Sequence, residues 1–350
     1  MKILRIYTRL PPLIGGMENH IVQLTKEQIK IGHDVSIYFN HGDSITTNDV
    51  QVTKIPLFKI KPQFIGLLVF HLLVLVRLII NRRKFDVVHI HGDWSSMIFS
   101  KLVKLLVCAE KLVFTIHDQL TENIIKKSLL NVAIRHADVI FSTGYKAADE
   151  LRKLTNKKVI VQPSGVNKIF FSGCNRKFEK KQLQVITVAN LIKKKNLGLI
   201  LDIAKDKPTL NFIILGIGKE KAFLKNRILS ESINNVKILG HKNSKELLLL
   251  YCQSDIFLFT SYKEGTPTVI LEAAACGLPI VCSSAGGVKS ILHNQNFIIE
   301  KNSKSKFVNC LSILDSNNAL RESISLKNKI HSEGYTWKNV ALNIDKYIQK

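Results

Sequence analysis

The sequence predicts an α/β protein of two doubly wound, Rossmann-like domains whose parallel sheets face each other across a cleft. Short runs rich in Val and Ile, apolar on both faces, alternate with longer helical patterns along the 350 residues. This alternation indicates strand–helix–strand crossovers in a parallel sheet that is covered on both sides. About eleven such runs are present, which is more than one open sheet of typical size holds. A polar, basic stretch at residues 164–182 interrupts them, and there we place the domain boundary.

The predicted strands form two series, one on each side of this stretch. The first series comprises residues 2–7, 34–39, 86–90, 111–116, 138–142 and 158–162. The second comprises residues 183–188, 210–215, 236–239, 255–259 and 279–282. Residues 1–165 then form the first domain and residues 166–334 the second. The remaining residues 335–350 have the pattern of an amphipathic helix with a large aromatic anchor at Trp337.

Positive charge is the outlier of the composition. Lys and Arg number 51 and Asp and Glu number 27, which gives a net charge of +24. Such an excess favours anionic partners, namely phosphorylated substrates, acidic lipid surfaces or nucleic acid. Because the lysines are spread along the whole chain, a composition bias that aids solubility is the alternative. No nucleic-acid motif is visible, so we expect no nucleic-acid partner.

The cysteines and residues 1–16 give indications of the cellular compartment. The six cysteines include no C-x-x-C pair, the spacing that metal and redox sites use. We therefore expect no metal site and interpret the cysteines as buried free thiols in a reducing compartment. Residues 1–16 lack the pattern of a signal peptide. These observations predict a cytoplasmic protein.

Residues 64–80 are the most apolar segment of the chain, interrupted by His71 and Arg77 and flanked by basic residues. The segment is shorter than the roughly 20 residues that a transmembrane helix needs. Three interpretations stay open: a buried or half-buried crossover helix, a helix lying on an anionic membrane surface, and a true span. The second would place the protein peripherally on the inner face of the plasma membrane.

The segment 259–287 carries the strongest candidate site. Glu264 and Glu272 are eight positions apart. Thr266 suits the cap of a helix, and Pro267 suits its first position because the missing N–H has no partner there. The pattern thus predicts Glu264 in a loop and Glu272 inside the helix that follows.

The start of this predicted helix is a candidate phosphate site. The backbone N–H groups near Thr268 and Val269 have no partner within the helix, and the helix dipole favours an anion at that end. A diphosphate at this position would lie between the two carboxylates, one of which would accept hydrogen bonds from a sugar and the other from a ribose. An ordinary capped helix with two solvated glutamates is the alternative.

The segment resembles the E-x7-E signature of retaining GT-B glycosyltransferases, specifically those of family 4. The spacing of Glu264 and Glu272, the following A-C-G-L-P and the later Gly286–Gly287 all match. The resemblance implies that Glu264 positions the donor sugar and that Glu272 binds the ribose hydroxyls. The donor-binding residues it implies in this segment are Glu264, Gly265, Thr266, Thr268, Val269 and Glu272.

Segments of the N-terminal half extend the resemblance. Residues 13–20 look like the Gly-Gly loop of the family, in which Gly15 and Gly16 let the backbone approach the donor. Residues 85–93 and 114–118 each place a histidine at the end of a strand. By the match His117 lies near the donor sugar and phosphate, while His91 and Asp118 are candidates for the acceptor side.

Segments of the C-terminal half complete it, with two departures. Lys195 in residues 188–201 falls on the family lysine that faces the diphosphate. Asn190 stands where the family usually has Arg, whose planar fork binds phosphate in a way that Asn cannot reproduce, and no Glu follows near Ser290. Gly216 and Gly218 form a Gly-x-Gly turn that would close the nucleotide pocket, although a purely structural turn is equally compatible. The resemblance also implies that the final helix packs back on the first domain.

The function that follows is a retaining glycosyltransferase with Glu264, His117 and Lys195 in catalytic roles. It would move a hexose-type sugar from a UDP- or GDP-sugar to a hydroxyl of a glycan or lipid-linked glycan, in the assembly of a bacterial surface polysaccharide such as lipopolysaccharide or capsule. The nucleotide sugar is a co-substrate, and no cofactor is expected. The chain contains no Asp-x-Asp, which agrees with a metal-independent reaction.

Two other function classes are alternatives to this one. A degenerate GT-B scaffold or a protein that only binds nucleotide sugars is the main alternative, motivated by Asn190. A nicotinamide-dependent oxidoreductase is disfavoured because the first strand is not followed by a complete G-x-G-x-x-G.

Overall fold

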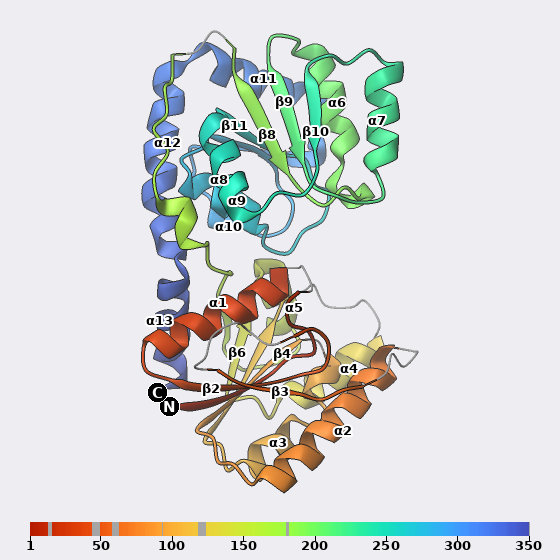
Figure 1. Ribbon diagram of the computed structural model, residues 1–350, viewed down its shortest axis with the longest axis vertical. Helices are drawn as coiled ribbons and strands as arrows, with labels where there is room; N and C mark the ends of the chain where they lie inside the picture. Colours follow the sequence, from red (N-terminus) through yellow and green to blue (C-terminus); the bar gives the residue numbers. More distant parts are fainter. Residues whose placement is uncertain are drawn as a thin grey trace. The chain divides into compact units, whose positions relative to one another are not determined.

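The computed structural model describes residues 1–12, 16–43, 50–57, 63–92, 94–117, 124–179 and 182–349. The chain divides into two compact units, Met1–Gly165 with Trp337–Lys350, called unit 1 below, and Val166–Thr336, called unit 2. Each unit is a parallel sheet with helices on both faces (Figure 1). Two parallel α/β units of this kind are the fold class that the sequence predicts.

Unit 1 contains a seven-stranded parallel sheet in the order β3-β2-β1-β4-β5-β6-β7. Its strands are β1 (Lys2–Ile6), β2 (Asp34–Phe39), β3 (Gln51–Lys54), β4 (Val87–Gly92), β5 (Lys111–Ile116), β6 (Val139–Ser142) and β7 (Val159–Val161). Strand β3 was not predicted, because three of its four residues are polar and it lies, partly exposed, at the edge of the sheet. Strand β4 extends past the predicted end, so His91 lies within it.

The helices of unit 1 cover the two faces of this sheet. They are α1 (Gly16–Lys30), α2 (Gln63–Asn81), α3 (Ser100–Leu106), α4 (Ile124–Ile134), α5 (Tyr145–Arg152) and α13 (Trp337–Ile348). Successive side chains of a strand point to opposite faces. Leu4 therefore joins the core under α2 to α5, whereas Ile3 joins the core under α1 and α13. This alternation explains why both faces of the sheet are apolar.

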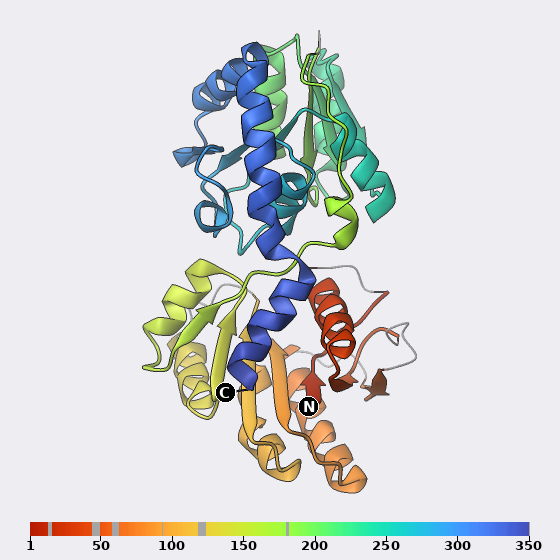
Figure 2. The same ribbon diagram turned by 90° about the vertical axis from the view of Figure 1, so that its left-hand side faces the viewer.

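The final helix α13 is fixed to α1 by buried polar groups as well as by packing. Trp337 and Ile344 are buried in the core that α13 shares with α1. Figure 2 shows these two helices side by side. Asp345 accepts a hydrogen bond from Gln28 at 3.0 Å, and its other oxygen lies 2.6 Å from His33 Nε2. Burial lowers the pKa of the nearby Arg5 to about 9, although the Asp345 carboxylate acts in the opposite direction. The C-terminal segment is thus an integral part of unit 1.

Unit 2 contains a six-stranded parallel sheet in the order β10-β9-β8-β11-β12-β13. Its strands are β8 (Gln184–Val188), β9 (Asn211–Leu215), β10 (Val236–Leu239), β11 (Ile256–Phe259), β12 (Ile280–Ser283) and β13 (Phe297–Ile299). The helices are α6 (Leu197–Asp206), α7 (Lys221–Ser230), α8 (Ser244–Gln253), α9 (Thr268–Ala275), α10 (Val288–Ile291), α11 (Lys304–Ser316) and α12 (Asn318–Ser332). Strand β13, which has three residues, was not predicted from the sequence.

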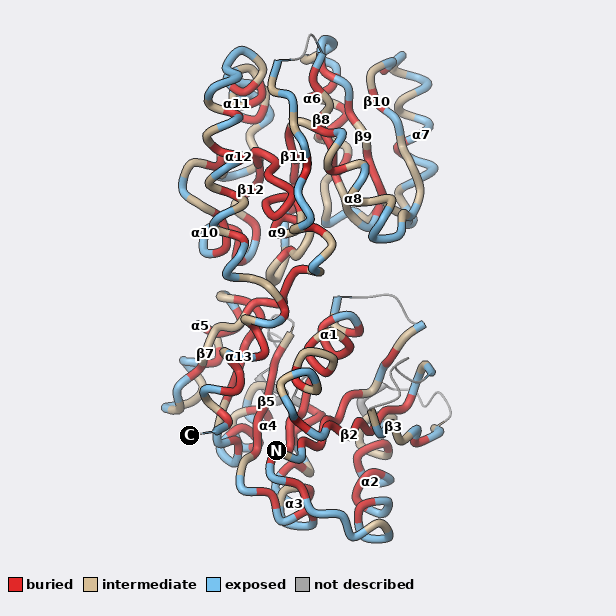
Figure 3. Tube along the Cα trace, turned by 60° about the vertical axis from the view of Figure 1, so that its left-hand side comes forward, coloured by how far each residue is buried: buried red, intermediate tan, exposed pale blue. Residues whose placement is uncertain are grey.

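The apolar segment at residues 64–80 forms most of α2, a crossover helix between β3 and β4 with one buried and one exposed face (Figure 3). Phe70 and Val74 are fully buried in the core, whereas Val76 and Ile80 are 52% and 66% exposed. Within the described residues, none of the helices has the length and apolar character needed to cross a bilayer. The exposed apolar face of α2 remains available for contact with another surface.

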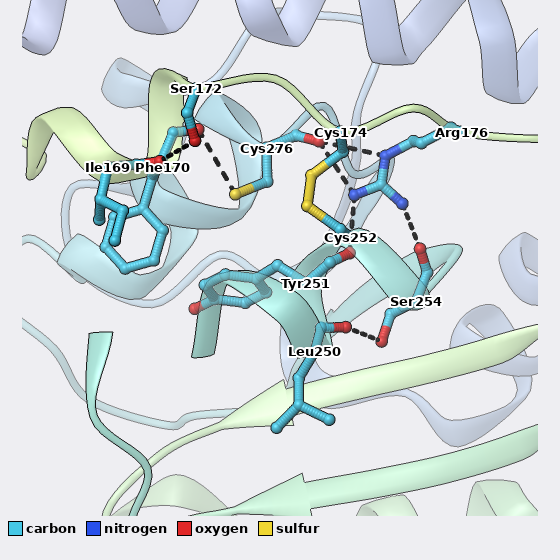
Figure 4. The surroundings of a disulfide bond; sticks show 10 residues. All are labelled: Ile169, Phe170, Ser172, Cys174, Arg176, Leu250, Tyr251, Cys252, Ser254 and Cys276. Carbon is cyan, nitrogen blue, oxygen red and sulfur yellow. Dashed lines mark hydrogen bonds between the residues drawn. A yellow bond between two sulfur atoms is a disulfide. The ribbon is translucent and has the colours of Figure 1, made fainter. Parts of the chain in front are cut away.

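The cysteines differ from the expectation of buried free thiols. Cys174 and Cys252 are joined by a disulfide bond (Figure 4), and Cys108 is exposed. The two bonded residues are 78 positions apart, and they meet because the segment after residue 171 runs alongside α8. No local spacing signals such a pairing. Burial raises the pKa of the free Cys276 thiol to about 12, so this thiol is kept in its neutral form.

Candidate functional site

The predicted residues of unit 2 lie in loops that follow neighbouring strands. Lys195 follows β8, Gly216 follows β9 and Glu264 follows β11. Because β8, β9 and β11 are adjacent and parallel, these loops leave the same edge of the sheet, the edge where ligands of doubly wound proteins bind.

Lys195 and Glu264 form an ion pair at this edge. Lys195 Nζ lies 2.5 Å from Glu264 Oε1. The exposed fractions of the two side chains are 14% and 10%, so the charges are largely removed from water. The hydroxyl of Thr260 donates to the backbone carbonyl of Lys195 at 3.0 Å, and this bond joins the loop after β8 to the end of β11.

The helix after Glu264 begins one residue later than the sequence predicts. Pro267 occupies the N-cap position with an extended backbone, and α9 starts at Thr268. The expectation that Thr266 caps the helix and that Pro267 is its first residue is therefore wrong. Pro267 precedes the first helical residue, and its ring offers no acceptor for the N–H groups of Thr268 and Val269. Those groups still lie where the sequence places a candidate phosphate site.

Glu272 lies in the second turn of α9, where burial raises the pKa of its carboxyl group to about 7. The hydroxyl of Tyr251, on α8, donates to Glu272 Oε2 at 3.4 Å and partly offsets this effect. Tyr251 is fully buried and precedes the disulfide-bonded Cys252, as Figure 4 shows. The disulfide therefore fixes α8 at the point where it supports Glu272.

Gly286 and Gly287, the two later glycines of the motif, pack against the backbone of the Glu264 loop. The N–H of Gly287 donates to the carbonyl of Gly265 at 2.9 Å. Gly286 has a φ of +64°, and a Cβ on it would lie 2.3 Å from the Gly265 carbonyl oxygen and 2.5 Å from that of Glu264. Only glycine allows this approach, so the spacing between the Glu264 loop and the Gly-Gly pair has a steric cause.

Gly216 and Gly218 have a structural explanation of the same kind. A Cβ on Gly216 would lie 1.9 Å from the carbonyl oxygen of Ala189, and one on Gly218 would lie 2.3 Å from that of Leu191. Both glycines have positive φ. The turn thus packs directly against the loop after β8, which holds Asn190 exposed to solvent. Its role toward a nucleotide stays a prediction.

In unit 1 the structure brings together histidines from three different elements. His91 Nδ1, in β4, lies 3.0 Å from His117 Nε2, just after β5. His20, in α1, contacts His117 edge to face, with ring centroids 4.7 Å apart. His89 stacks on His91 at 4.0 Å and lies 2.7 Å from Thr115 Oγ1. Burial lowers the pKa of His117 to about 4, so its imidazole is neutral at about pH 7.

The remaining predicted residues of unit 1 are placed only in part. Gly16 is exposed and opens α1, where backbone N–H groups are free of helical partners. Gly15 and Asp118 lie outside the described residues.

Sequence reasoning missed His20, His89 and Tyr251. His20 stands four positions after Gly16, one helical turn away, and His89 stands two positions before His91, on the same face of a strand. These spacings were visible in the sequence. Tyr251 carries no such signal, because its contact with Glu272 depends on how α8 packs against α9.

Two family models match the chain. "Glycosyltransferase Family 4" matches residues 14–168 and "Glycosyl transferases group 1" matches residues 175–331. Among curated relatives, a human protein named as part of the phosphatidylinositol N-acetylglucosaminyltransferase is 28% identical over 96% of this chain and 73% of its own length. The GPI3 subunit of the Saccharomyces cerevisiae phosphatidylinositol N-acetylglucosaminyltransferase is 25% identical over 94% of this chain and 78% of its own length.

Solved structures show the same fold. HepE of Anabaena in complex with UDP superposes with a TM-score of 0.83 at 16% identity, covering 100% of both chains. Sucrose-phosphate synthase of Thermosynechococcus elongatus superposes with a TM-score of 0.82 at 14% identity, covering 99% of this chain and 98% of that one. The protein belongs to the glycosyltransferases of family 4 and has their GT-B fold of two Rossmann-like domains.

Proposed function

We propose that the protein is a retaining, metal-independent transferase that moves an N-acetylhexosamine from a UDP-sugar to a hydroxyl of a lipid acceptor. The observation that carries the proposal is the Lys195–Glu264 pair beside the open N-terminus of α9. A cation, free N–H groups and a carboxylate are the groups that a sugar diphosphate requires.

In the proposed reaction the diphosphate separates the ion pair. Lys195 turns to the phosphate oxygens, and Glu264 accepts hydrogen bonds from the sugar hydroxyls. The N–H groups of Thr268 and Val269 complete the phosphate site. As the bond to the sugar breaks, negative charge grows on the leaving diphosphate, and these groups stabilise it without a metal ion. Glu272 accepts hydrogen bonds from the ribose hydroxyls.

The acceptor hydroxyl attacks from the same face as the departing diphosphate, and a phosphate oxygen takes its proton. This route retains the configuration at the sugar and requires no protein nucleophile. His117, neutral at about pH 7, is proposed as a hydrogen-bonding partner of the donor, with Gly16 lending backbone N–H groups. Gly15, Gly216, Gly218, Gly265 and Thr266 remain proposed donor-binding residues, as His91 and Asp118 remain proposed acceptor-side residues.

The choice of donor rests on the relatives. Two curated relatives are named as parts of N-acetylglucosaminyltransferases, and a structural neighbour was solved with UDP. These names support UDP-N-acetylglucosamine over GDP-mannose. Asn190 stands in place of the usual Arg and cannot form the two parallel hydrogen bonds that a guanidinium makes to phosphate. We therefore expect the donor to bind mainly through Lys195 and α9.

The choice of a lipid acceptor rests on the surface of unit 1 as well as on the relatives. The exposed apolar side chains of α2 continue onto α3, where Leu102 and Leu105 are 50% and 63% exposed. The basic residues Arg82, Arg83 and Lys101 border them and are exposed. An apolar face with a basic border suits a membrane that contains anionic lipid, and we propose that unit 1 lies peripherally on such a membrane.

A second candidate acceptor is a lipid-linked glycan of a bacterial surface polysaccharide. It is favoured by a 26% identical match over 48% of this chain to a putative teichuronic acid biosynthesis glycosyltransferase of Bacillus subtilis, TuaC. Both candidates place the acceptor at a membrane.

The test is a transfer assay with three donors and two acceptors. The purified chain is given UDP-N-acetylglucosamine, UDP-glucose or GDP-mannose, with vesicles that contain phosphatidylinositol or with a lipid-linked glycan extract, in EDTA. We expect a glycolipid from UDP-N-acetylglucosamine and phosphatidylinositol, with the α-linkage retained. Transfer to the glycan extract alone would select the second candidate. A requirement for added Mg²⁺ or Mn²⁺, or a β-linked product, would overturn the proposed mechanism.

A further inference from the structure

The histidines of unit 1 form a cluster with the geometry of a metal-binding site. His20, His91 and His117 each offer a ring nitrogen, and these nitrogens all lie within 4.8 Å of one another. They come from α1, from β4 and from the residue after β5, so three separate elements hold them. Three imidazoles with an open fourth position are a common ligand set for Zn²⁺.

The hydrogen bonding of the cluster leaves ring nitrogens without partners. Among the residues that the structure describes, His20 Nε2 and His91 Nε2 are buried and accept or donate no hydrogen bond. The two residues are 1% and 2% exposed. A buried polar atom without a partner is unfavourable, and a bound cation is one way to use such a lone pair.

The surroundings orient the rings as outer-shell groups orient metal-binding histidines. Ser164 Oγ lies 2.8 Å from His20 Nδ1. When Nδ1–H donates to this hydroxyl, the lone pair is on Nε2, as a ligand requires. His89 stacks behind His91 and is itself tied to Thr115, while Trp337 packs edge to face on His20 at 5.2 Å.

We propose that His20, His91 and His117 bind one transition-metal dication of the Zn²⁺ class within unit 1. The fourth position, at the half-buried His117 side, is left for water or another ligand.

The protonation state of the cluster agrees with this proposal. The charged groups that face it are Arg5 and the histidines themselves, including His89, and burial is the main cause that lowers the pKa of each ring. The pKa of His117 is about 4. The site therefore keeps neutral imidazoles, which is the form that binds metal.

The proposed transferase chemistry uses no metal, but the metal site shares His117 and His91 with the residues proposed to contact the donor and the acceptor. Because His117 is also a proposed donor contact, a bound ion would compete with the donor sugar, and Zn²⁺ would inhibit transfer. This consequence rests on the proposed function, whereas metal binding itself does not.

The test titrates the metal-free full chain with Co²⁺ at about pH 7, where an ordinary histidine is largely neutral, and follows the visible bands of tetrahedral cobalt. We expect one equivalent to bind. His117→Ala and His91→Gln should each weaken binding about tenfold or more. His136→Ala, which removes an exposed histidine, should bind as the unmodified chain does. Circular dichroism verifies that the variants are folded.

Three outcomes would overturn the proposal. The absence of tetrahedral bands would show that the cluster does not bind the metal in this geometry. Equal binding by folded His117→Ala, or loss of binding in His136→Ala, would show that the metal binds to other histidines. Co²⁺ binding without any effect on transfer would leave the site standing and remove only the competition with donor.

Discussion

Lys195 Nζ lies 2.5 Å from Glu264 Oε1, although the two residues follow different strands, β8 and β11. Their side chains are mostly buried, so each charge depends on the other for compensation. A ligand that separates the pair must replace both interactions. A sugar diphosphate has an anion for the lysine and hydroxyl donors for the glutamate, whereas free phosphate has only the anion.

Replacing Lys195 should lower activity far more than replacing the nearby Lys193. Lys195→Ala removes the cation from the proposed diphosphate site, and we expect kcat/KM to fall about 100-fold or more. Lys193→Ala is the matched control, because Lys193 is exposed in the same short helix and should change kcat/KM little. Steady-state kinetics of both variants decide the point. Equal losses in both would attribute the effect to general surface charge.

Stability should fall with rising pH because of Glu272. Its pKa in the folded protein is raised to about 7 from the ordinary value of 4.5, so the folded state binds more protons than the unfolded state between these values. The free energy of unfolding contributed by this group therefore decreases from about pH 4.5 to about pH 7 and then levels off. Glu272→Gln should raise Tm relative to the unmodified chain at about pH 8 and leave it nearly unchanged at about pH 4.5. Thermal unfolding that shows the same difference at both pH values would contradict this assignment.

A side chain on Gly286 should disturb the Glu264 loop. Gly286→Ala forces a Cβ against the carbonyls of Glu264 and Gly265 in a left-handed conformation, and we expect a loss of about 1–3 kcal/mol in the free energy of unfolding. Activity should fall as well, measured at a temperature where the variant is folded. Gly334→Ala serves as control, since a Cβ there would contact nothing within 4 Å. Full activity of folded Gly286→Ala would show that the loop position is not important.

Membrane binding should depend on the exposed face of α2. Val76→Glu with Ile80→Glu places charges on this face without touching the buried core, and we expect flotation with anionic vesicles at low salt to be lost. Leu229→Glu is the matched control, because Leu229 is 78% exposed on α7 of unit 2. Absence of vesicle binding by the unmodified chain would reject a peripheral membrane position.

The fold could be predicted because its signal is local. Each central strand is a short apolar run, and alternation with helices defines the parallel sheets. The strand Gln51–Lys54 escaped prediction because an edge strand with polar residues lacks that signal. The predicted start of α9 differed from the observed one by one residue. The sequence alone does not decide whether Pro267 is the cap or the first helical residue.

The candidate site could be predicted only where spacing reflects backbone geometry. Glu264, Glu272 and Gly286 belong to one continuous segment, so their relation is visible in the sequence. The Cys174–Cys252 bond and the Tyr251–Glu272 contact are tertiary interactions, and no local sequence pattern predicts either of them. The spacing of His20 from Gly16, and that of His89 from His91, placed each pair on one face of its element. Which elements then meet depends on the order of the strands in the sheet.

The most direct test of the central claim is the release of free nucleotide from a panel of UDP- and GDP-sugars, measured in EDTA with the unmodified chain, Lys195→Ala and Glu264→Ala. We predict slow release of UDP from one donor by the unmodified chain and its loss in both variants. Release that persists in folded Lys195→Ala and Glu264→Ala, or the absence of release and binding for every donor even with acceptor lipid present, would contradict the claim that this pair forms the donor site of a transferase.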